Sequence, residues 1–230
     1  MKITVIIPAL NEATNILRSL DSITGQHGEF EIIVVDGCST DGTADVARRH
    51  ARVIASEQRG RAIQMNAGAQ HACGEVFVFL HADSCLPRNA LSMLRSALAD
   101  PKIVGGTFTL RFDSTQFLLR FIAFFTRFRF RFFHYGDQGI FVRRAIFEEL
   151  GGFKQIPVME DIDFLQRLSR RGCVTLIKKP VTSSARRFLR HGIIRQQLLD
   201  ILLVVLYLLG VSPEKLSKWY SLTDCRGINH

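Results

Sequence analysis

The sequence has few cysteines, and none of them is placed to hold a metal ion or a disulfide framework. The five residues are odd in number and form no C-x-x-C pair: Cys38, Cys73, Cys85, Cys173 and Cys225. Disulfide-rich secreted domains and zinc modules carry paired or regularly spaced cysteines. We therefore expect a cytoplasmic protein. The first apolar run is interrupted by Pro8 and by Asn11-Glu12, which does not fit a signal peptide.

Several other signatures are missing from the sequence. It contains no G-x-G-x-x-G and no glycine-rich loop that ends in Gly-Lys-Ser or Gly-Lys-Thr, so hydride transfer and ATP hydrolysis lose their usual support. No helix-turn-helix or zinc-finger pattern is present, and nucleic acid is not an expected partner. The apolar run at 201–211 is shorter than the roughly 20 residues that a membrane-spanning helix needs.

The composition is that of a packed enzyme with a basic balance of charge. The chain has 230 residues, of which 47% are hydrophobic and 22% charged, and its formal net charge is +9. These values suit one large domain and exclude a disordered chain. The positive charge fits a solvated surface, an anionic ligand, an anionic lipid or nucleic acid.

Strand-like and helix-like segments alternate over the first hundred residues. Buried-strand patterns occur at 3–9, 31–35, 53–55 and 75–80, and helix-starting signals follow them. Asn11 is expected to cap the first helix. This order predicts an α/β fold with a mostly parallel central sheet flanked by helices. We expect one domain over residues 1–190 and a C-terminal apolar helical appendage over 191–230.

Acidic residues follow three of these strands. Glu12 follows the first strand, Asp36 the second and Asp83 the fourth, and Glu160-Asp161 opens a later helix. Parallel sheets bind ligands at the carboxyl ends of their strands, so these side chains are expected to meet in one cleft. Carboxylates there can bind ribose or base groups, hold a cation or accept a proton. For each motif alone, a helix cap or an ordered turn is the competing interpretation.

The segment around Arg61 adds a candidate anion site. Arg59-Gly60-Arg61 opens a helix that includes Gln64. Glycine lets the main chain approach a ligand, a helix N-terminus attracts anions, and Arg61 can bind a diphosphate bidentately. A charged surface loop is the alternative interpretation.

The strand at 75–80 leads into His81-Ala82-Asp83. Asp83 can bind Mg²⁺ or Mn²⁺ together with phosphate oxygens, because hard cations take oxygen ligands. His81 can be a second ligand, and a purely structural histidine is the alternative.

These motifs together resemble a known family. Residues 5–12 (VIIPALNE) and 36–43 (DGCSTDGT), then His81-Ala82-Asp83 and Glu160-Asp161, are similar in order to the signatures of family-two glycosyltransferases of the GT-A fold. The resemblance covers residues 2–190. The run 59–68 (RGRAIQMNAG) and the later run 184–187 (SARR) more narrowly resemble a small bacterial subgroup named for arsenosugar biosynthesis.

The resemblance implies an inverting transferase of hexosyltransferase type that uses a nucleotide sugar, such as a UDP- or GDP-sugar, and a divalent cation. It implies Asp161 as the general base with Glu160 beside it, and Asp83 with His81 at the metal position. His81 departs from the pattern, because many relatives have the first Asp of a D-x-D motif there, and metal dependence stays open. The residues expected to contact the donor are Pro8, Asn11, Glu12, Asp36, Arg61, Gln64 and Ala82.

Two apolar segments lie in the second half of the chain. From Phe117 to Phe133, phenylalanines recur at three- and four-residue steps, with arginines along one edge. This pattern is typical of a helix in a membrane interface, and a core or dimer-contact helix is the alternative. From Ile193 to Val211 a second apolar helix is expected, ending at Ser212-Pro213. Together they predict peripheral attachment to the cytoplasmic membrane face, with a homo-oligomer as the alternative.

Two other functions stay open at this point. A sugar-nucleotide nucleotidyltransferase would need a glycine-rich, basic N-terminal loop for a triphosphate, and residues 8–12 provide neither feature. A non-catalytic basic module that binds membrane or nucleic acid is favoured by the net charge and by the Phe/Arg segment.

Overall fold

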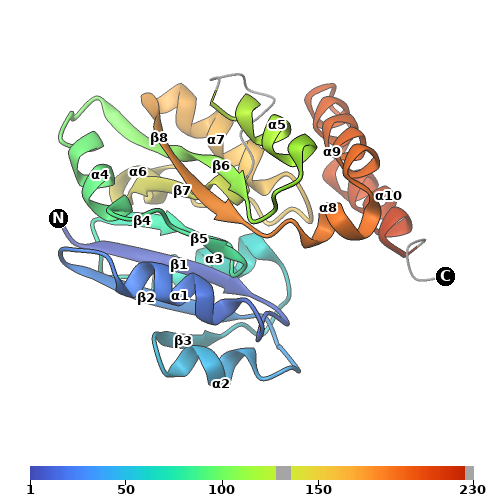
Figure 1. Ribbon diagram of the computed structural model, residues 1–230. Coiled ribbons are helices and arrows are strands. Elements are labelled where there is room, and N and C mark those ends of the chain that lie inside the picture. Colours follow the sequence, from blue (N-terminus) through green and yellow to red (C-terminus); the bar gives the residue numbers. More distant parts are fainter. Residues whose placement is uncertain (128–135, 226–230) are drawn as a thin grey trace.

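The computed structural model describes residues 1–127 and 136–225 (Figure 1). The strands are β1 (Ile3–Ala9), β2 (Phe30–Asp36), β3 (Arg52–Ala55), β4 (Val76–Phe79), β5 (Ser84–Cys85), β6 (Ile103–Phe112), β7 (Ile140–Arg143) and β8 (Cys173–Ser183). The helices are α1 (Ile16–Thr24), α2 (Thr43–Arg48), α3 (Arg61–Gln70), α4 (Ala90–Ala97), α5 (Phe117–Phe125), α6 (Arg144–Glu149), α7 (Glu160–Arg171), α8 (Arg186–His191), α9 (Ile193–Leu208) and α10 (Pro213–Cys225), with a 3-10 turn at Gly136–Gln138.

In the part of the chain that the structure describes, the strands form one eight-stranded sheet in the order β3-β2-β1-β4-β7-β6-β8-β5. The half from β3 to β4 is parallel. The other half is mixed, because β7 runs antiparallel to both β4 and β6 whereas β6 and β8 are parallel. The predicted α/β class, with a central sheet flanked by helices, is confirmed.

Alternating strand residues feed two hydrophobic cores, one on each face of the sheet. On β4, Val76 and Val78 pack into the core with α1, α2 and α4, whereas Phe77 and Phe79 pack into the core with α3, α6 and α7. Figure 1 shows α1 in front of the sheet and α3 behind it. Strands covered on both faces require continuous apolar runs, and the runs in β1 and β2 have this composition.

Five phenylalanines join β4 to α6 and α7 within one of these cores. Their rings lie in contact at favourable edge-on or tilted angles, with the Phe153 and Phe164 centroids 4.5 Å apart and the Phe79 and Phe153 centroids 4.8 Å apart. Phe77 and Phe147 complete the group. Aromatic pairs of this kind stabilise a core beyond their buried area. The cluster therefore holds α7, whose first turn carries Glu160 and Asp161, against the sheet.

A third, smaller core lies at the far end of β6. Phe112 packs there against Phe188 of α8 and near Leu119 of α5. Ile193 at the start of α9 packs against the same core. The C-terminal helices α9 and α10 follow at the edge of the molecule beside α8 (Figure 1). The start of α9 is thereby packed against the core at the end of β6.

Some local expectations are wrong. Asn11 does not cap α1, because the helix begins at Ile16 and Asn11 has a positive φ of 55° in the preceding loop. The apolar helix expected from Ile193 to Val211 ends at Leu208, and a further helix, α10, begins at Pro213. Residues 128–133 of the Phe/Arg segment lie outside the described residues. None of the described helices combines the length and apolar character that crossing a membrane requires.

Candidate active site

Strand register places the predicted acidic motifs at one edge of the sheet. Ala9 at the end of β1 lies opposite Asp36 at the end of β2. The N–H of Leu80, just after β4, donates to the carbonyl of Ile6 at 3.0 Å. The short β5 pairs with the end of β8, so that Ser84 lies opposite Ser183. The pairing brings the residues after β8 beside Asp83.

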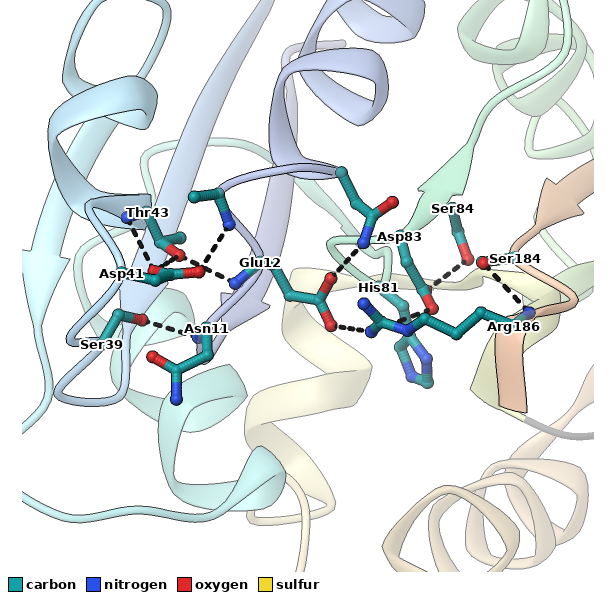
Figure 2. A network of polar contacts seen from close by, with 12 residues as sticks. Asn11, Glu12, Ser39, Asp41, Thr43, His81, Asp83, Ser84, Ser184 and Arg186 are labelled. Carbon is teal, nitrogen blue, oxygen red and sulfur yellow. Dashed lines mark hydrogen bonds and ion pairs between the residues drawn. The ribbon is translucent and has the colours of Figure 1, made fainter. Parts of the chain in front are cut away.

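The loops after β1 and β2 are tied together by side chains. The Asn11 N–H donates to Ser39 Oγ at 2.9 Å, and Asn11 Oδ1 accepts from the Thr40 N–H at 2.9 Å. The Glu12 N–H donates to Thr43 Oγ1 at 2.8 Å, as Figure 2 shows. Asn11 therefore orders the loop, and the carboxylate of Glu12 is left to face the next strand end.

Arg186 joins two of the predicted acids. Its guanidinium donates to Glu12 Oε1 and lies 4.0 Å from Asp83 Oδ2. Figure 2 shows this side chain reaching from the start of α8 toward Glu12, past Asp83. Burial raises the pKa of the Asp83 carboxyl, and the nearby Arg186 opposes this rise. A cation thus already lies where two carboxylates of distant segments meet.

The predicted donor residues near β1 and β2 differ in what they can offer a ligand. Gln64 is buried, and its Nε2 donates to the carbonyls of Ala9 and Val35 at 2.9 and 2.8 Å, so it fixes the strand ends instead of facing a ligand. Pro8 and Ala82 are also buried. Asp36 Oδ2 accepts from the Ser39 N–H at 3.0 Å. Among the described residues, the buried Asp36 Oδ1 has no hydrogen-bond partner, which suits an acceptor for an N–H or O–H of a ligand.

Helix α3 brings Arg61 to the start of α7. A Cβ on Gly68 would lie 2.4 Å from Ile6 Cγ2, so glycine allows α3 to pack closely on β1. Arg61 Nε lies 2.8 Å from Oε1 of the buried Glu160. Burial raises the pKa of Glu160, Arg61 opposes this, and the adjacent Asp161 adds to it. Two predicted sites, the anion-binding arginine and the acidic pair, are therefore parts of one charged group.

His81 is paired with Asp137 of the 3-10 turn. Its Nδ1 lies 2.9 Å from Asp137 Oδ1. Burial alone would lower the pKa of His81, but the hydrogen bond and charge of Asp137 outweigh it and raise the value. Burial alone would raise the pKa of the Asp137 carboxyl. The hydrogen bond from His81 and the charges of His81 and Arg61 outweigh burial and hold this pKa well below its usual range. The structure thus favours a charged imidazolium at His81.

This pair gives a testable pH dependence in the metal-free protein. Asp137 contributes to stability above its ordinary pKa of 3.8, and the contribution is lost as the pH falls. His81 contributes below its ordinary pKa of 6.5, and the contribution is lost as the pH rises through its raised value. We expect Asp137→Asn to lower the pKa of His81 below 6.5, because burial then dominates.

The measurement is an NMR titration of the His81 ring, with the exposed His50 as internal control. An unchanged His81 titration in Asp137→Asn would show that the contact does not set the charge of the ring.

Several predicted residues line one cavity of about 470 Å³. A volume of this size suits a small ligand. Arg61, His81, Asp83 and Asp161 lie on its wall, together with Asp137. Glu12, Asp36 and Glu160 do not line it, although Arg186 connects Glu12 to Asp83 and Arg61 connects Glu160 to the wall.

The sequence did not identify the contribution of the C-terminal helices. Asp200 of α9 lines the cavity and accepts hydrogen bonds from Arg187 at 2.6 Å and Gln196 at 2.8 Å. The Arg187 guanidinium lies 5.0 Å from the ring centroid of Tyr220 in α10. The sequence signal was an acidic residue, Asp200, next to the long apolar run of this helix.

The described residues fit a divalent cation that arrives with a diphosphate. Asp83 offers one carboxylate at the cavity wall, and Mg²⁺ commonly binds one or two protein carboxylates plus substrate phosphates. No three His, Cys, Asp or Glu side chains of the described segments gather closely enough to hold an ion alone. Since His81 Nδ1 is engaged by Asp137, Asp83 is the better candidate ligand of the two.

Comparison with known proteins agrees with this arrangement. The mannosyltransferase PcManGT of Pyrobaculum calidifontis, solved with GDP-Man and Mn²⁺, superposes with a TM-score of 0.65 at 27% identity, over 92% of this chain and 66% of its own. The fold is therefore the GT-A fold of glycosyltransferases. The chain belongs to glycosyl transferase family 2, whose profile matches residues 4–151.

Curated relatives point to the same family. The PGL/p-HBAD biosynthesis glycosyltransferase of Mycobacterium bovis is 30% identical over 199 residues, which are 80% of this chain and 77% of that protein. Glycosyltransferase AglE of Haloferax volcanii is 36% identical over 95 residues, 37% of this chain. The matched part spans only 31% of AglE, so the relatives contain sequence that this chain does not match.

Proposed function

We propose that this chain is an inverting glycosyltransferase that moves a sugar from a nucleotide-diphosphate donor to an acceptor hydroxyl. The observation that carries the proposal is that Asp83 and Asp161, 78 positions apart in the sequence, line the same cavity. Asp83, the candidate residue for the diphosphate and its cation, and Asp161, the candidate base, can therefore both act on a substrate bound in this cavity. A nucleotidyltransferase finds no comparable support, since the family is that of glycosyl transferases.

The described residues divide the reaction between them. Asp161 takes the proton of the acceptor hydroxyl while the hydroxyl oxygen bonds to the anomeric carbon of the sugar. The bond from that carbon to the diphosphate breaks, and the nucleoside diphosphate leaves with the electron pair. In this proposal Arg61 and Arg186, which are paired with Glu160 and Asp83, stabilise this growing negative charge, because fixed cations act strongly in a site sheltered from water.

The donor binds along the ends of β1, β2 and β4 in this proposal. Asp36 accepts a hydrogen bond from the nucleoside through its unpaired Oδ1. Glu12 and Asp83 lie toward the ribose and diphosphate. A Mg²⁺ or Mn²⁺ ion held at Asp83 would neutralise charge on the departing diphosphate. The neighbour solved with GDP-Man and Mn²⁺ supports a sugar nucleotide and a cation of this kind.

Calorimetry with UDP- and GDP-sugars, with and without Mn²⁺, tests the proposal. We expect one of these donors to bind, and Mn²⁺ to tighten its binding. Asp83→Ala should abolish the increase in donor affinity that Mn²⁺ causes. We expect the affinity for the donor in the presence of Mn²⁺ to fall at least about tenfold, because a charge-assisted contact contributes roughly 1.5–3 kcal/mol.

The matched control is Asp21→Asn, because Asp21 is an exposed residue of α1 that does not line the cavity. No heat with any nucleotide sugar would count against the transferase itself. Donor binding that Mn²⁺ leaves unchanged would instead remove the metal from the proposal and keep the rest.

The predicted subgroup and the predicted location of the protein stay predictions. The similarity of residues 59–68 and 184–187 to the subgroup named for arsenosugar biosynthesis does not identify an acceptor. Arg61 and Arg186, which belong to those two runs, nevertheless lie at the site. The cytoplasmic location also stays a prediction.

A further inference from the structure

The cavity has two chemically different walls. One wall is charged and carries Arg61, His81, Asp83, Asp137 and Asp161. The other wall is apolar and comes from β6, α5, α8 and α9; it consists of Leu110, Phe112, Ile122, Phe188, Leu203 and Val204. A nucleotide sugar has no aliphatic chain to place along the second wall, and its base is assigned to the ends of β1 and β2 on the other side of the site. The apolar wall therefore belongs to the other substrate, the acceptor.

Two of the helices that contribute to the apolar wall, α5 and α9, also expose apolar side chains. On α5, Phe117 is 79% exposed, and Phe121 and Phe124 are about half exposed. On α9, Ile194 and Leu198 are more than 60% exposed, and Leu202 is half exposed. We call these six residues the outer apolar face. Exposed apolar surface on two neighbouring helices marks an interaction site.

Basic residues border this face. Arg120 of α5, Arg190 of α8 and Arg195 of α9 are exposed, and Trp219 of α10 is 50% exposed. Apolar side chains bordered by arginine and tryptophan are typical of helices that lie in the headgroup region of an anionic bilayer. The net charge of +9 adds a long-range attraction between the protein and an anionic membrane surface.

We propose that the acceptor is an amphipathic lipid taken from an anionic membrane surface on which α5 and α9 rest. Its hydroxyl-bearing head lies between Asp161 and Asp200, where Asp200 is held in place by Arg187 and Gln196. Its apolar chain lies along the apolar wall toward the outer apolar face. This inference rests on the proposed function and adds the class of acceptor.

Membrane binding is tested with vesicles. We expect the protein to sediment with vesicles of phosphatidylcholine containing about 30% phosphatidylglycerol, and not with pure phosphatidylcholine vesicles. Trp219 is the only tryptophan of the chain, so its fluorescence should shift to the blue on binding. Phe117→Gln with Phe121→Gln, and separately Leu198→Gln with Leu202→Gln, should each weaken binding about tenfold or more.

The matched control is Leu17→Gln, because Leu17 is an exposed leucine of α1, 42% exposed, away from the outer apolar face. Unchanged vesicle binding in both double variants would overturn the membrane-facing role. A stable dimer without lipid that becomes a monomer in either double variant would assign the face to a second copy of the chain and overturn it equally.

The apolar wall is tested with two soluble probes, methyl and octyl β-glucoside below the micelle concentration. We expect the octyl compound to bind at least about tenfold more tightly, since each buried methylene strengthens binding about fourfold. Ile122→Gln, which puts an amide in the wall, should remove the difference. Its melting temperature and its affinity for the sugar nucleotide report whether the fold is intact.

The outcomes separate the two proposals. Absence of sugar-nucleotide binding would overturn the transferase and the lipid acceptor together. Sugar-nucleotide binding, with equal affinity for the two glucosides and no vesicle binding, would overturn only the lipid acceptor.

Discussion

Asp161→Asn is expected to lower the rate of sugar transfer by about 10²- to 10⁴-fold, the range that general acid–base catalysis contributes. The amide has nearly the shape of the carboxylate but cannot take the proton of the acceptor hydroxyl. Asp161 lies in the first turn of α7 and lines the cavity together with Asp83. Its Oδ1 accepts the N–H of Ile162 at 2.8 Å, a contact that the amide oxygen can keep.

Donor binding separates this role from a general disturbance of the site. The affinity for the nucleotide sugar should change by less than about threefold in Asp161→Asn, because donor contacts are assigned to the strand ends and to Arg61. Transfer is measured with radiolabelled donor, and donor binding by calorimetry. Asp163→Asn is no suitable control, since Asp163 is buried and paired with Lys154 and Arg167; Asp21→Asn serves again. A loss of less than about tenfold in transfer would assign the proton to another group.

The first half of the fold was readable from the sequence because strand, turn and helix follow each other locally. Buried parallel strands need unbroken apolar runs, and β1 occupies the predicted residues 3–9 without shift. The helix predicted to open near Arg61 begins at this residue. The sheet order that gathers Glu12, Asp36 and Asp83 at one edge follows from right-handed crossovers.

The rest of the site depends on contacts between distant segments. Glu12 and Arg186 are 174 positions apart and meet only because β5 pairs with the end of β8, a pairing two residues long. Strand β6 is antiparallel to β7 and parallel to β8, a mixed pairing that no local pattern specifies. Asp200 reaches the cavity because α9 packs beside α8, which no local pattern specifies.

The pairing of charges in the site is another feature that could not be predicted from the sequence. Sequence motifs marked Arg61 and Glu160 as separate candidates for phosphate and proton transfer, yet the two side chains are an ion pair with an N–O distance of 2.8 Å. Since Glu160 is 2% exposed, the pairing lets its charge be buried. Glu160 is thereby better suited to position Arg61 than to exchange protons with a substrate.

Phe164→Ala is expected to lower the free energy of unfolding by about 3–5 kcal/mol, the usual cost of removing a buried phenylalanine from a core. The ring is 0% exposed and contacts Phe153 and Phe147 at centroid distances of 4.5 and 5.5 Å. Urea unfolding measures the loss. Phe117→Ala, at a ring that is 79% exposed, should stay within about 0.5 kcal/mol of the wild type.

The position of this ring links stability to catalysis. Phe164 lies one helical turn after Glu160 and Asp161 on α7, so the cavity left by alanine loosens the helix that carries the candidate base. We expect transfer by the folded fraction of Phe164→Ala to fall by more than donor binding does, because the strand ends are untouched. Phe164→Leu, which restores most of the volume, should recover both stability and transfer in part. If Phe164→Ala lost stability yet transferred sugar at the wild-type rate, the aromatic cluster would support the fold without positioning Asp161.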